Sequence, residues 1–281
     1  VSLTGTYLLF DDLTITLELA GQTAYAVLRN SVFAAIPLFV LMGEFVRKAG
    51  SGGDLYRVMN FSMRRVPGRL AVATVAGNAV FAAVTGTSLA SAALFSRLAY
   101  PEMIAAGYSR KFALGSIAGS ACLGMLIPPS VLLIIWGIVI EHSIGKLFLA
   151  GIIPGIMISG AFFVWIMLRS RWGEAITPEE DEPMDWGAVF RGLLQIWPLP
   201  VLIFFVLGTI YMGVATPTEA ASLGVVASIV MGFVWGNLTP GQLWSAFING
   251  TIMFSAIAMI MLGTAILSQA VSLLGLPREA V

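Results

Sequence analysis

The sequence predicts an all-α polytopic membrane protein, and three observations lead to that fold class. Of the 281 residues, 58% are hydrophobic and only 11% are charged, and the mean hydropathy is +0.92. A soluble domain carries roughly a quarter charged residues, so this composition excludes an ordinary water-facing surface. Apolar stretches long enough to cross a hydrocarbon core about 30 Å thick recur along the chain. Polar or proline-containing breaks interrupt two of these stretches, around residues 85–88 and 128–129.

Residue counts argue against most enzyme and metal chemistry. The chain has one cysteine, Cys122, and one histidine, His142, so it can form neither an internal disulfide nor a Cys/His metal cluster. It contains no P-loop and no Gly-x-Gly-x-x-Gly fingerprint, so we do not expect it to use ATP. Residues 86–90 approach a nucleophile elbow, but neither a strand nor a suitable histidine accompanies them. The net charge of +0 is uninformative about a nucleic-acid partner. We expect no nucleic-acid partner, and we expect a protein that is not an enzyme.

The first 30 residues are of mixed polarity. Asp11, Asp12 and Glu18 lie among leucine and isoleucine there, which predicts an interfacial helix or a loop over 1–30. Beyond this segment, six apolar stretches have about the length of a spanning helix. They cover residues 31–49, 112–140, 146–168, 196–214, 218–236 and 250–275.

The stretch 68–104 is predicted to be a re-entrant hairpin that enters and leaves the membrane by one face. Basic residues mark the cytoplasmic ends of membrane segments, and they flank both ends of this stretch. A simple crossing would place the two groups on opposite sides, so a turn is expected at 85–88. The basic residues are Arg47, Lys48, Arg57, Arg64, Arg65 and Arg69 on one flank, and Arg97, Arg110 and Lys111 on the other.

Two structural units are expected. An acidic, proline-containing cytoplasmic linker with a short surface helix, over 173–195, separates them. The first unit, 31–172, is the first repeat, and 196–281 is the start of a second. Residues 39–43 are similar to residues 259–263, and alternating the crossings gives the two copies opposite orientations. Inverted repeats with broken helices are a common plan of secondary transporters.

The first candidate site is the hairpin turn, with Thr85, Gly86, Thr87 and Ser88. Gly86 permits backbone angles that other residues resist, and Thr87 or Ser88 can cap the helix that follows. A helix N-terminus in a low dielectric attracts an anion, and the hydroxyl groups can bind a carboxylate or a small cation. The alternative is simple packing, because small polar residues are common where membrane helices touch.

The second candidate site surrounds a double proline and comprises Gly124, Met125, Ile127, Pro128 and Ser130. The two prolines lack the N–H groups that would bond the carbonyls of Gly124 and Met125 in a continuous helix, so the helix should break. Ser130 can cap the helical half that follows. The freed carbonyls and the hydroxyls suit a desolvated sodium ion, and a packing kink is the alternative.

Three more residues are possible members of the site: Asn78, Thr216 and Glu219. Asn78 lies deep in the first half of the hairpin, where it either bridges helices or lines the site. Thr216 and Glu219 fit a capping box with a proline at its best-tolerated position, and an ion or gating role is the alternative. Glu44 has basic residues three and four positions later, so local pairing is favoured over a proton relay.

These residues resemble the large membrane subunit of TRAP transporters, the tripartite ATP-independent periplasmic carriers. Five stretches match the family in order over most of the chain, and their combination is specific although no single stretch is. They are Ile36-Pro-Leu-Phe-Val-Leu-Met-Gly-Glu44, Val84-Thr-Gly-Thr-Ser-Leu-Ala-Ser91, Gly107-Tyr-Ser-Arg-Lys-Phe112, Gly124-Met-Leu-Ile-Pro-Pro-Ser130 and Ala215-Thr-Pro-Thr-Glu-Ala-Ala221.

The resemblance implies sodium-coupled uptake of a small organic acid, of the C4-dicarboxylate, keto acid or sialic-acid class, across the bacterial inner membrane. It implies an elevator-type movement, Na⁺ as the coupling ion and no other cofactor. The implied partners are a small four-helix membrane subunit and a periplasmic substrate-binding protein. Residues 85–88 would be the tip of the first hairpin, and 124–130 the unwound helix facing it. The resemblance implies that these two parts hold Na⁺ between them, at Gly86, Ser88, Gly124 and Ile127. The family pattern has further helices before residue 1, and a second hairpin and broken helix after residue 281.

Three alternatives stay open. A related inverted-repeat symporter would carry sodium and an anion without a binding protein. A non-transporting membrane scaffold subunit would leave both breaks without a ligand. An intramembrane enzyme is disfavoured, because the chain has one histidine and one cysteine and no acid pair predicted to be buried.

Overall fold

The computed structural model describes residues 7, 12–172 and 186–273. Every regular element in those ranges is helical, which confirms the all-α prediction. The predicted linker over 173–185 lies outside the described residues. The helices, with η for 3-10, are α2 (Leu13–Arg29), η1 (Ser31–Ala34), α3 (Ala35–Lys48), α4 (Ser51–Ser62), α5 (Arg69–Thr85), α6 (Ser88–Ala105), α7 (Arg110–Ala121), η2 (Cys122–Met125), α8 (Val131–Val139), α9 (Ile144–Arg171), α10 (Trp186–Ile196), α11 (Pro198–Tyr211), α12 (Pro217–Val234) and α13 (Pro240–Leu273).

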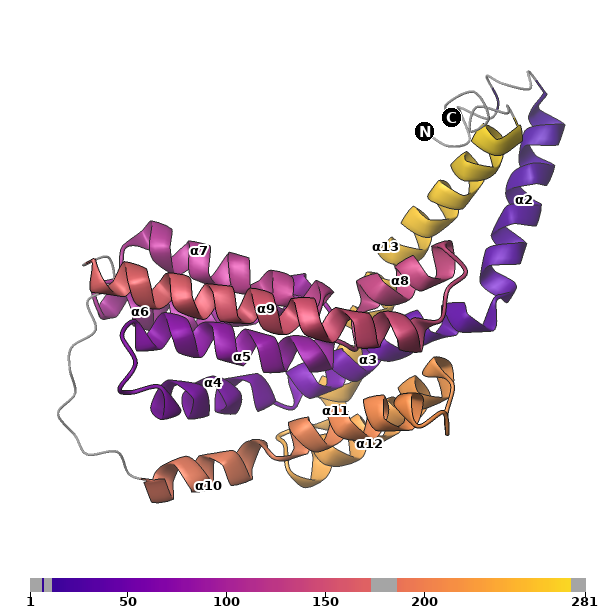
Figure 1. The fold of residues 1–281 in the computed structure, drawn as a ribbon. Helices are drawn as coiled ribbons and strands as arrows, with labels where there is room; N and C mark the ends of the chain where they lie inside the picture. The colour runs from indigo at the N-terminus through magenta and orange to yellow at the C-terminus, as the bar shows by residue number, and fades with distance from the viewer. Residues whose placement is uncertain (1–6, 8–11, 173–185, 274–281) are drawn as a thin grey trace.

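Helices α5 and α6 form a hairpin at the centre of one group of helices (Figure 1). Only Gly86 and Thr87 join them, because Gly86 ends α5 with a φ of +62° and the extended Thr87 begins α6. Helix α7, the short η2 and α9 pack beside the hairpin, and α4 covers another side. The Phe95 ring packs edge-on against Tyr56 and Phe81, which ties α6 to both α4 and α5.

Helix α3 connects this group to the rest of the molecule. It contacts α5 on one side and α12 and α13 on the other. Its side chains Ile36, Phe39 and Met42 are fully or almost fully buried, as expected for a helix covered all round. Gly224 on α12 allows a close approach, since a Cβ there would lie 2.6 Å from the Met42 sulfur. Helices α2 and α13 extend together away from the bundle (Figure 1).

Helix lengths divide the predicted spans into two kinds. Helices α9, α12 and α13 are each long and apolar enough to cross a membrane. The predicted span 31–49 is instead the 14-residue α3 after a 3-10 turn, and it meets that test only together with α2. The two parts bend by 66° at Asn30, whose side chain accepts a hydrogen bond from the Val32 N–H and so starts a new helix. The segment predicted as an interfacial helix or loop is helical over Leu13–Arg29.

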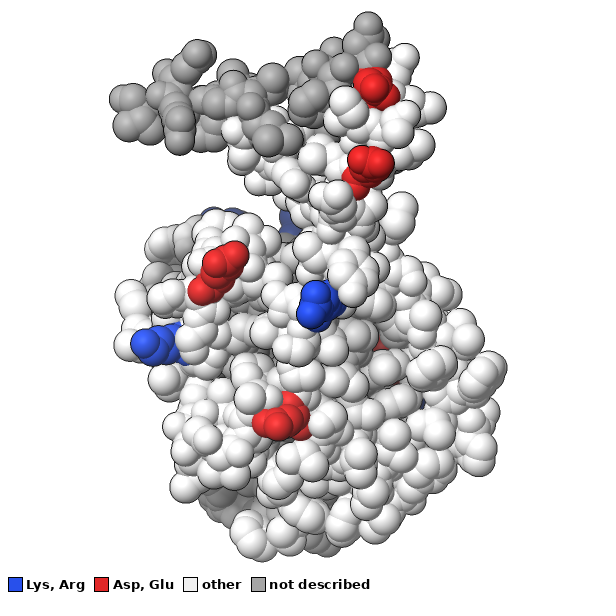
Figure 2. Space-filling view, turned by 90° about the vertical axis from the view of Figure 1, so that its right-hand side faces the viewer, with Lys and Arg blue, Asp and Glu red and all other residues white. Residues whose placement is uncertain are grey.

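Basic residues gather at one end of the bundle. The start of α5, the start of α7 and the end of α9 lie together on the left of Figure 1. A Cβ at Gly68 would overlap the Ser170 side chain, so the start of α5 and the end of α9 are in contact. The opposite end, which faces the viewer in Figure 2, carries only scattered charged side chains. This asymmetry matches the excess of Lys and Arg on cytoplasmic ends, so we take the left-hand end as cytoplasmic.

Candidate functional site

The tip of the α5–α6 hairpin lies against the break between η2 and α8. The Val131 N–H donates a hydrogen bond to the Gly86 carbonyl at 3.2 Å, so the tip satisfies a backbone donor in the first turn of α8. A Cβ at Gly86 would lie 2.7 Å from the Pro129 carbonyl oxygen. With a φ of +62° as well, this position requires glycine. The structure therefore brings together the two breaks that the sequence singled out.

Two further glycines fix the position of the tip. A Cβ at Gly124, in η2, would lie 2.9 Å from the Thr87 carbonyl carbon and 3.2 Å from the Ser88 nitrogen. A Cβ at Gly43, in α3, would lie 2.7 Å from the Thr85 Cα. These neighbours are backbone atoms, which cannot rotate away as the end of a flexible side chain can. A larger residue at either glycine would therefore displace the hairpin tip.

Thr87 has the backbone of an N-cap residue but does not cap α6. Its φ of −134° and ψ of 134° suit an N-cap, yet its side chain makes no capping hydrogen bond. Its Oγ1 is buried and has no hydrogen-bond partner within the described part of the chain. Ser91 lies one turn later on the same face of α6, and its fully buried Oγ also has no partner there. Unpaired buried hydroxyls are rare in proteins, and a bound ion or water is a usual explanation.

Other hydroxyl groups near the break are used internally. Ser130 Oγ donates to the Met125 carbonyl at 2.8 Å and accepts from the Leu133 N–H at 3.5 Å, so Ser130 caps α8 as predicted. The Met125 carbonyl, which the double proline was expected to leave free, is therefore bonded. Thr85 Oγ1 donates to the Phe81 carbonyl at 3.1 Å. Around the break, Thr87 and Ser91 therefore stand out as buried hydroxyls that have no partner in the described part of the chain.

The remaining predicted residues lie at different depths around the break. Pro128 and Gly124 are buried, Ser88 and Ile127 are half-buried, and Met125 is exposed. The Ser88 and Gly124 backbones are in contact, as the Gly124 distances show. Of the four residues expected to hold Na⁺, Gly86, Ser88 and Gly124 lie in one region, where the hairpin tip contacts the break between η2 and α8.

Asn78 bridges two helices. Its Nδ2 donates to Ser120 Oγ at 2.6 Å, and Ser120 Oγ donates in turn to the Ser116 carbonyl. Its Oδ1 is buried and has no partner among the described residues. Asn78 lies eight residues before Gly86, which is about 12 Å along the helix axis. Of the two roles expected from the sequence, the structure therefore favours the bridge between α5 and α7.

Comparison with known proteins identifies the family. The family described as "Tripartite ATP-independent periplasmic transporter, DctM component" matches residues 1–280. The chain belongs to this family. The family resemblance inferred from the five sequence stretches is thereby confirmed.

Three curated DctM-family relatives illustrate the match. The ectoine TRAP transporter large permease protein TeaC of Halomonas elongata is 34% identical over 237 residues, covering 83% of this chain and 54% of that protein. UehC of Ruegeria pomeroyi, an ectoine/5-hydroxyectoine TRAP large permease, is 31% identical, with 98% and 64% covered. The C4-dicarboxylate TRAP large permease DctM of Rhodobacter capsulatus is 30% identical, with 99% and 66% covered. The chain thus spans between about half and two thirds of their length.

Family membership shows the location of the chain. TRAP large permeases are multi-pass proteins of the bacterial inner membrane, and the apolar helices of this chain agree with that location. The relatives are permease subunits of a tripartite transporter rather than enzymes. Among the described residues, no group of three or more His, Cys, Asp or Glu side chains could hold a metal ion.

The capping-box interpretation of Thr216 and Glu219 is confirmed. The Glu219 N–H donates to Thr216 Oγ1 at 3.3 Å, and the Thr216 N–H donates to Glu219 Oε2 at 2.8 Å. The predicted local pairing of Glu44 is also confirmed, because Arg47 Nε donates to Glu44 Oε1 at 2.9 Å. His142 is exposed, as expected. Local structure thus accounts for Thr216, Glu219 and Glu44 without a ligand.

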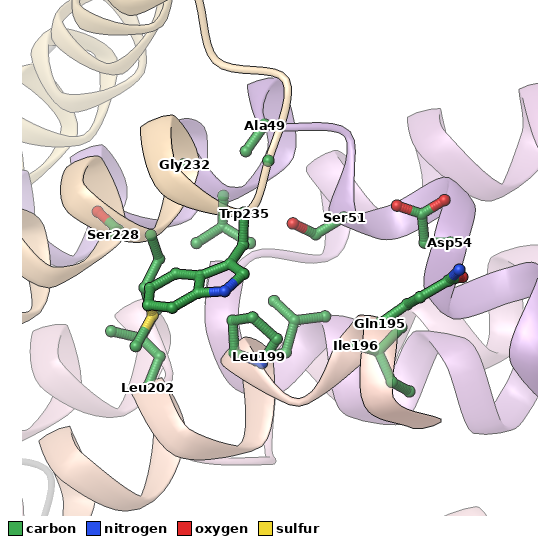
Figure 3. A pocket seen from close by; sticks show the side chains of 14 residues that line it. Ala49, Ser51, Asp54, Gln195, Ile196, Leu199, Leu202, Ser228, Gly232 and Trp235 are labelled. Atoms are coloured by element: carbon green, nitrogen blue, oxygen red, sulfur yellow. The ribbon is translucent and has the colours of Figure 1, made fainter. Parts of the chain in front are cut away.

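Two other hollows are poorer candidates for an anion site. An apolar hollow of about 480 Å³ lies behind the break, lined mainly by Ile127, Pro128 and isoleucines of α9, and it offers almost nothing to solvate an ion. The cavity in Figure 3 lies between α3, α4, α10, α11 and α12, where Trp235 lies beside Leu199 and away from Gln195. Its volume is about 40 Å³, whereas small-molecule sites are usually about 300–1,000 Å³.

Sequence reasoning did not select Gly43 or Ser91 as members of the candidate site. Gly43 lies in one of the stretches that carry the family resemblance, but nothing in its spacing indicates contact with Thr85. Ser91 offered a usable signal, because it follows Thr87 by four residues and so shares its helix face. Its burial and its unpaired oxygen are visible only once α7 and η2 are packed against α6.

Proposed function

We propose that this chain is part of a sodium-coupled TRAP permease that takes up a small organic acid together with a periplasmic binding protein and a small four-helix membrane subunit. The observation that carries the proposal is Thr87, an N-cap threonine whose hydroxyl is buried, makes no cap and meets no protein partner in the described chain. It lies where the hairpin tip crosses the broken helix.

The residues at the crossing fit a sodium ion. Thr87 Oγ1, Ser91 Oγ and backbone carbonyls near Gly86 and Gly124 are hard, neutral oxygen donors, which suit a hard monovalent cation better than a transition metal. Bound sodium supplies a positive charge that stabilises the tip against the break. Thr87 and Ser91 bind it, the three glycines keep the tip in place, and the apolar surroundings exclude water.

The substrate carboxylate is proposed to bind at the start of α6. The first N–H groups of a helix lack intrahelical partners and lie at the positive end of the helix dipole. The α6 N-terminus follows Thr87 directly, so ion and anion would lie side by side and stabilise each other. We expect the carried compound to be of the C4-dicarboxylate, keto acid or sialic-acid class. The names of the relatives support TRAP-type uptake and range from C4-dicarboxylate to ectoine and sialic acid permeases.

An elevator-type movement is the proposed transport step. Helices α5 to α9 pack together as one group that includes the hairpin. This group is connected to α12 and α13 mainly through α3. We propose that this group moves as a body and carries the site from one face of the membrane to the other. The movement would be permitted only when sodium and substrate together close the tip onto the break.

The test is uptake of labelled organic acids into proteoliposomes that contain the full-length permease and its small subunit. Uptake that requires both an inward sodium gradient and the binding protein is the expected result. Uptake without the binding protein would replace the proposal by a simpler sodium/anion symporter. Uptake that is indifferent to sodium, from protein shown to be folded, would eliminate the sodium site. No transport of any compound would favour a scaffold subunit.

A further inference from the structure

We propose that the cavity between α3, α6 and α13 is a second anion subsite, in which Arg97 binds a carboxylate of the carried acid on the cytoplasmic side of the hairpin tip. This cavity, called the Arg97 cavity below, has a volume of about 260 Å³. The inference deepens the proposed function and rests on it, because it takes the ligand to be the same organic acid.

Helix α6 supplies one wall of the Arg97 cavity and connects it to the hairpin tip. Ala90, Ala93 and Arg97 line the cavity, and their spacing of three and four residues places them on one face of α6. Arg97 follows Ser88, the first residue of α6, by nine residues, which is about 13 Å along the helix axis. Helix α6 runs from the tip toward the end of the bundle taken as cytoplasmic (Figure 1). This face therefore leads from the proposed carboxylate site at the start of α6 to Arg97.

Helices α3 and α13 pack together and supply the opposite wall. Glu44 and Arg47, near the end of α3, both line the cavity. Arg47 Nε donates to Glu44 Oε1 at 2.9 Å, and Arg47 Nη2 donates to Glu44 Oε2. Because this fork holds both carboxylate oxygens, the Glu44 charge is compensated by Arg47 and is not available to balance Arg97.

Arg97 gives the cavity its net positive charge. Its side chain is exposed and forms no salt bridge with a carboxylate in the described part of the chain. Among the described residues that line the cavity, Glu44 is the sole acidic one, and the remaining walls include Leu89, Leu94 and Met253. A cleft with one sign of charge and apolar walls raises the local concentration of ions of the opposite sign. An arginine in such a place favours an anion.

The size and chemistry of the cavity favour a small organic acid. Its volume lies just below the range of about 300–1,000 Å³ that is usual for small-molecule sites, so a compact acid suits it better than a nucleotide. The planar guanidinium of Arg97 matches a carboxylate, and the apolar walls suit the carbon skeleton. An acid that leaves the start of α6 loses the favourable helix dipole there. Arg97 would bind it next, before it reaches the cytoplasm.

Site-directed labelling tests the subsite without requiring transport. It uses the full-length permease with its small subunit in detergent, with the native cysteines, Cys122 among them, replaced by serine. Ala93→Cys then places a thiol in the cavity, one helical turn from Arg97. Relative to a free thiol, it should react about tenfold faster with a sulfonate-bearing methanethiosulfonate than with the trimethylammonium analogue. Arg97→Gln should remove this preference. The matched control Arg65→Gln, which removes an exposed arginine outside the cavity lining, should keep it.

Protection of the same thiol identifies the ligand. Succinate, pyruvate and N-acetylneuraminate represent the three expected classes of acid. At constant ionic strength, at least one of them should slow the labelling of Ala93→Cys by about tenfold, and inorganic phosphate should slow it by less than about twofold. Ala105→Cys, at the exposed end of α6 and outside the cavity lining, should be protected by none of them.

Uptake measurements connect the subsite to transport. In proteoliposomes, Arg97→Gln should lower sodium-driven uptake by about tenfold, as expected for the loss of one hydrogen-bonded charge. It should leave the sodium-dependent rise in unfolding temperature unchanged, because Arg97 does not contact the proposed ion. Arg97→Lys keeps the charge and should recover part of the uptake, and Arg65→Gln should transport like the unmodified permease.

The results separate the subsite from the proposed function. If the unmodified permease transports no organic acid, the proposed function fails, whereas protection of Ala93→Cys by an acid would still support the subsite. If the unmodified permease does transport, three results would each overturn the subsite. They are equal labelling by the two reagents, protection by phosphate as strong as by the acids, and normal uptake by Arg97→Gln. The second result would assign the cavity to inorganic anions.

Discussion

Thr87 and Thr216 begin helices in the same way but differ in what their hydroxyl groups do. Both are N-cap residues with extended backbone, and both follow a turn that contains a glycine with positive φ. Thr216 completes a capping box in which its hydroxyl and the Glu219 carboxylate each bond a backbone N–H. Thr87 makes no cap, and its buried Oγ1 has no partner in the described chain. The same local motif can therefore stabilise the start of a helix or be available to bind a ligand. Whether the hydroxyl has a hydrogen-bond partner in the protein distinguishes the two roles.

The glycines of the two turns repeat this contrast. Gly86 and Gly213 have φ values of +62° and +69°, so both positions strain any other residue equally. A Cβ at Gly213 would meet no atom within 4 Å, whereas at Gly86 it would lie 2.7 Å from the Pro129 oxygen. Backbone strain is therefore common to both turns, and only Gly86 adds a close contact with a second element.

The largest expected effect comes from Gly86→Ala compared with Gly213→Ala. Both should lose about 1–3 kcal/mol of unfolding free energy to backbone strain. Gly86→Ala should in addition push the tip from the break and lower sodium-driven uptake by about a hundredfold, because small misplacements at a site have effects of that size. Uptake per folded permease, with folding judged by size-exclusion profile, measures the difference. Equal uptake in the two variants would mean that the contact of tip and break does not matter for transport.

The second comparison replaces each threonine by valine, which has the same shape without the hydroxyl. Thr87→Val should weaken sodium binding by about tenfold, as expected for the loss of one ligand to a charged group. It should leave the sodium-free protein as stable or slightly more stable, because an unsatisfied buried hydroxyl is removed. Thr216→Val should cost about 1 kcal/mol of stability and leave sodium binding unchanged, because it removes an N-cap.

Sodium titration of the thermal unfolding temperature gives both quantities in one experiment. Thr87→Val should mainly change the response to sodium, and Thr216→Val should change the stability alone. If both variants lose stability and respond normally to sodium, Thr87 is an ordinary structural residue.

The positions of the two breaks could be predicted from the sequence because glycine and proline act on the backbone locally. Gly86 permits a positive φ, and consecutive prolines remove two N–H donors, whatever surrounds them. The capping box at Thr216 and Glu219 and the Glu44–Arg47 pair were predictable for the same reason. Each involves partners only three residues apart, a distance that helical geometry fixes.

Contacts between distant segments could not be predicted in this way. The bond from Val131 to Gly86 joins residues far apart in sequence, and the approach of Gly43 to Thr85 joins different helices. The use of the Met125 carbonyl by Ser130 depends on how the chain turns after the prolines. The mixed polarity of residues 1–30 left a helix and a loop both open, so the bend at Asn30 between α2 and η1 could not be predicted. In each case, tertiary packing or a side-chain hydrogen bond selects one of several backbone conformations that the sequence pattern allows.

The smallest expected effect concerns two fully buried serines, Ser91 and Ser228. Ser228 Oγ donates to the Val225 carbonyl at 2.7 Å, whereas Ser91 Oγ has no partner among the described residues. Replacement by alanine raises helix propensity equally at both positions, so the difference between the two variants isolates the hydroxyl.

Without sodium, Ser91→Ala should be more stable than Ser228→Ala by about 1 kcal/mol, since it removes an unsatisfied group rather than a bond. With sodium, Ser91→Ala should gain less stability than the wild type, because a ligand that binds only the folded state stabilises it in proportion to its affinity. Denaturant unfolding at two sodium concentrations measures both differences. Equal behaviour of the two variants would mean that a water satisfies Ser91, and Thr87 would then be left as the hydroxyl whose chemistry distinguishes the hairpin tip from an ordinary helix start.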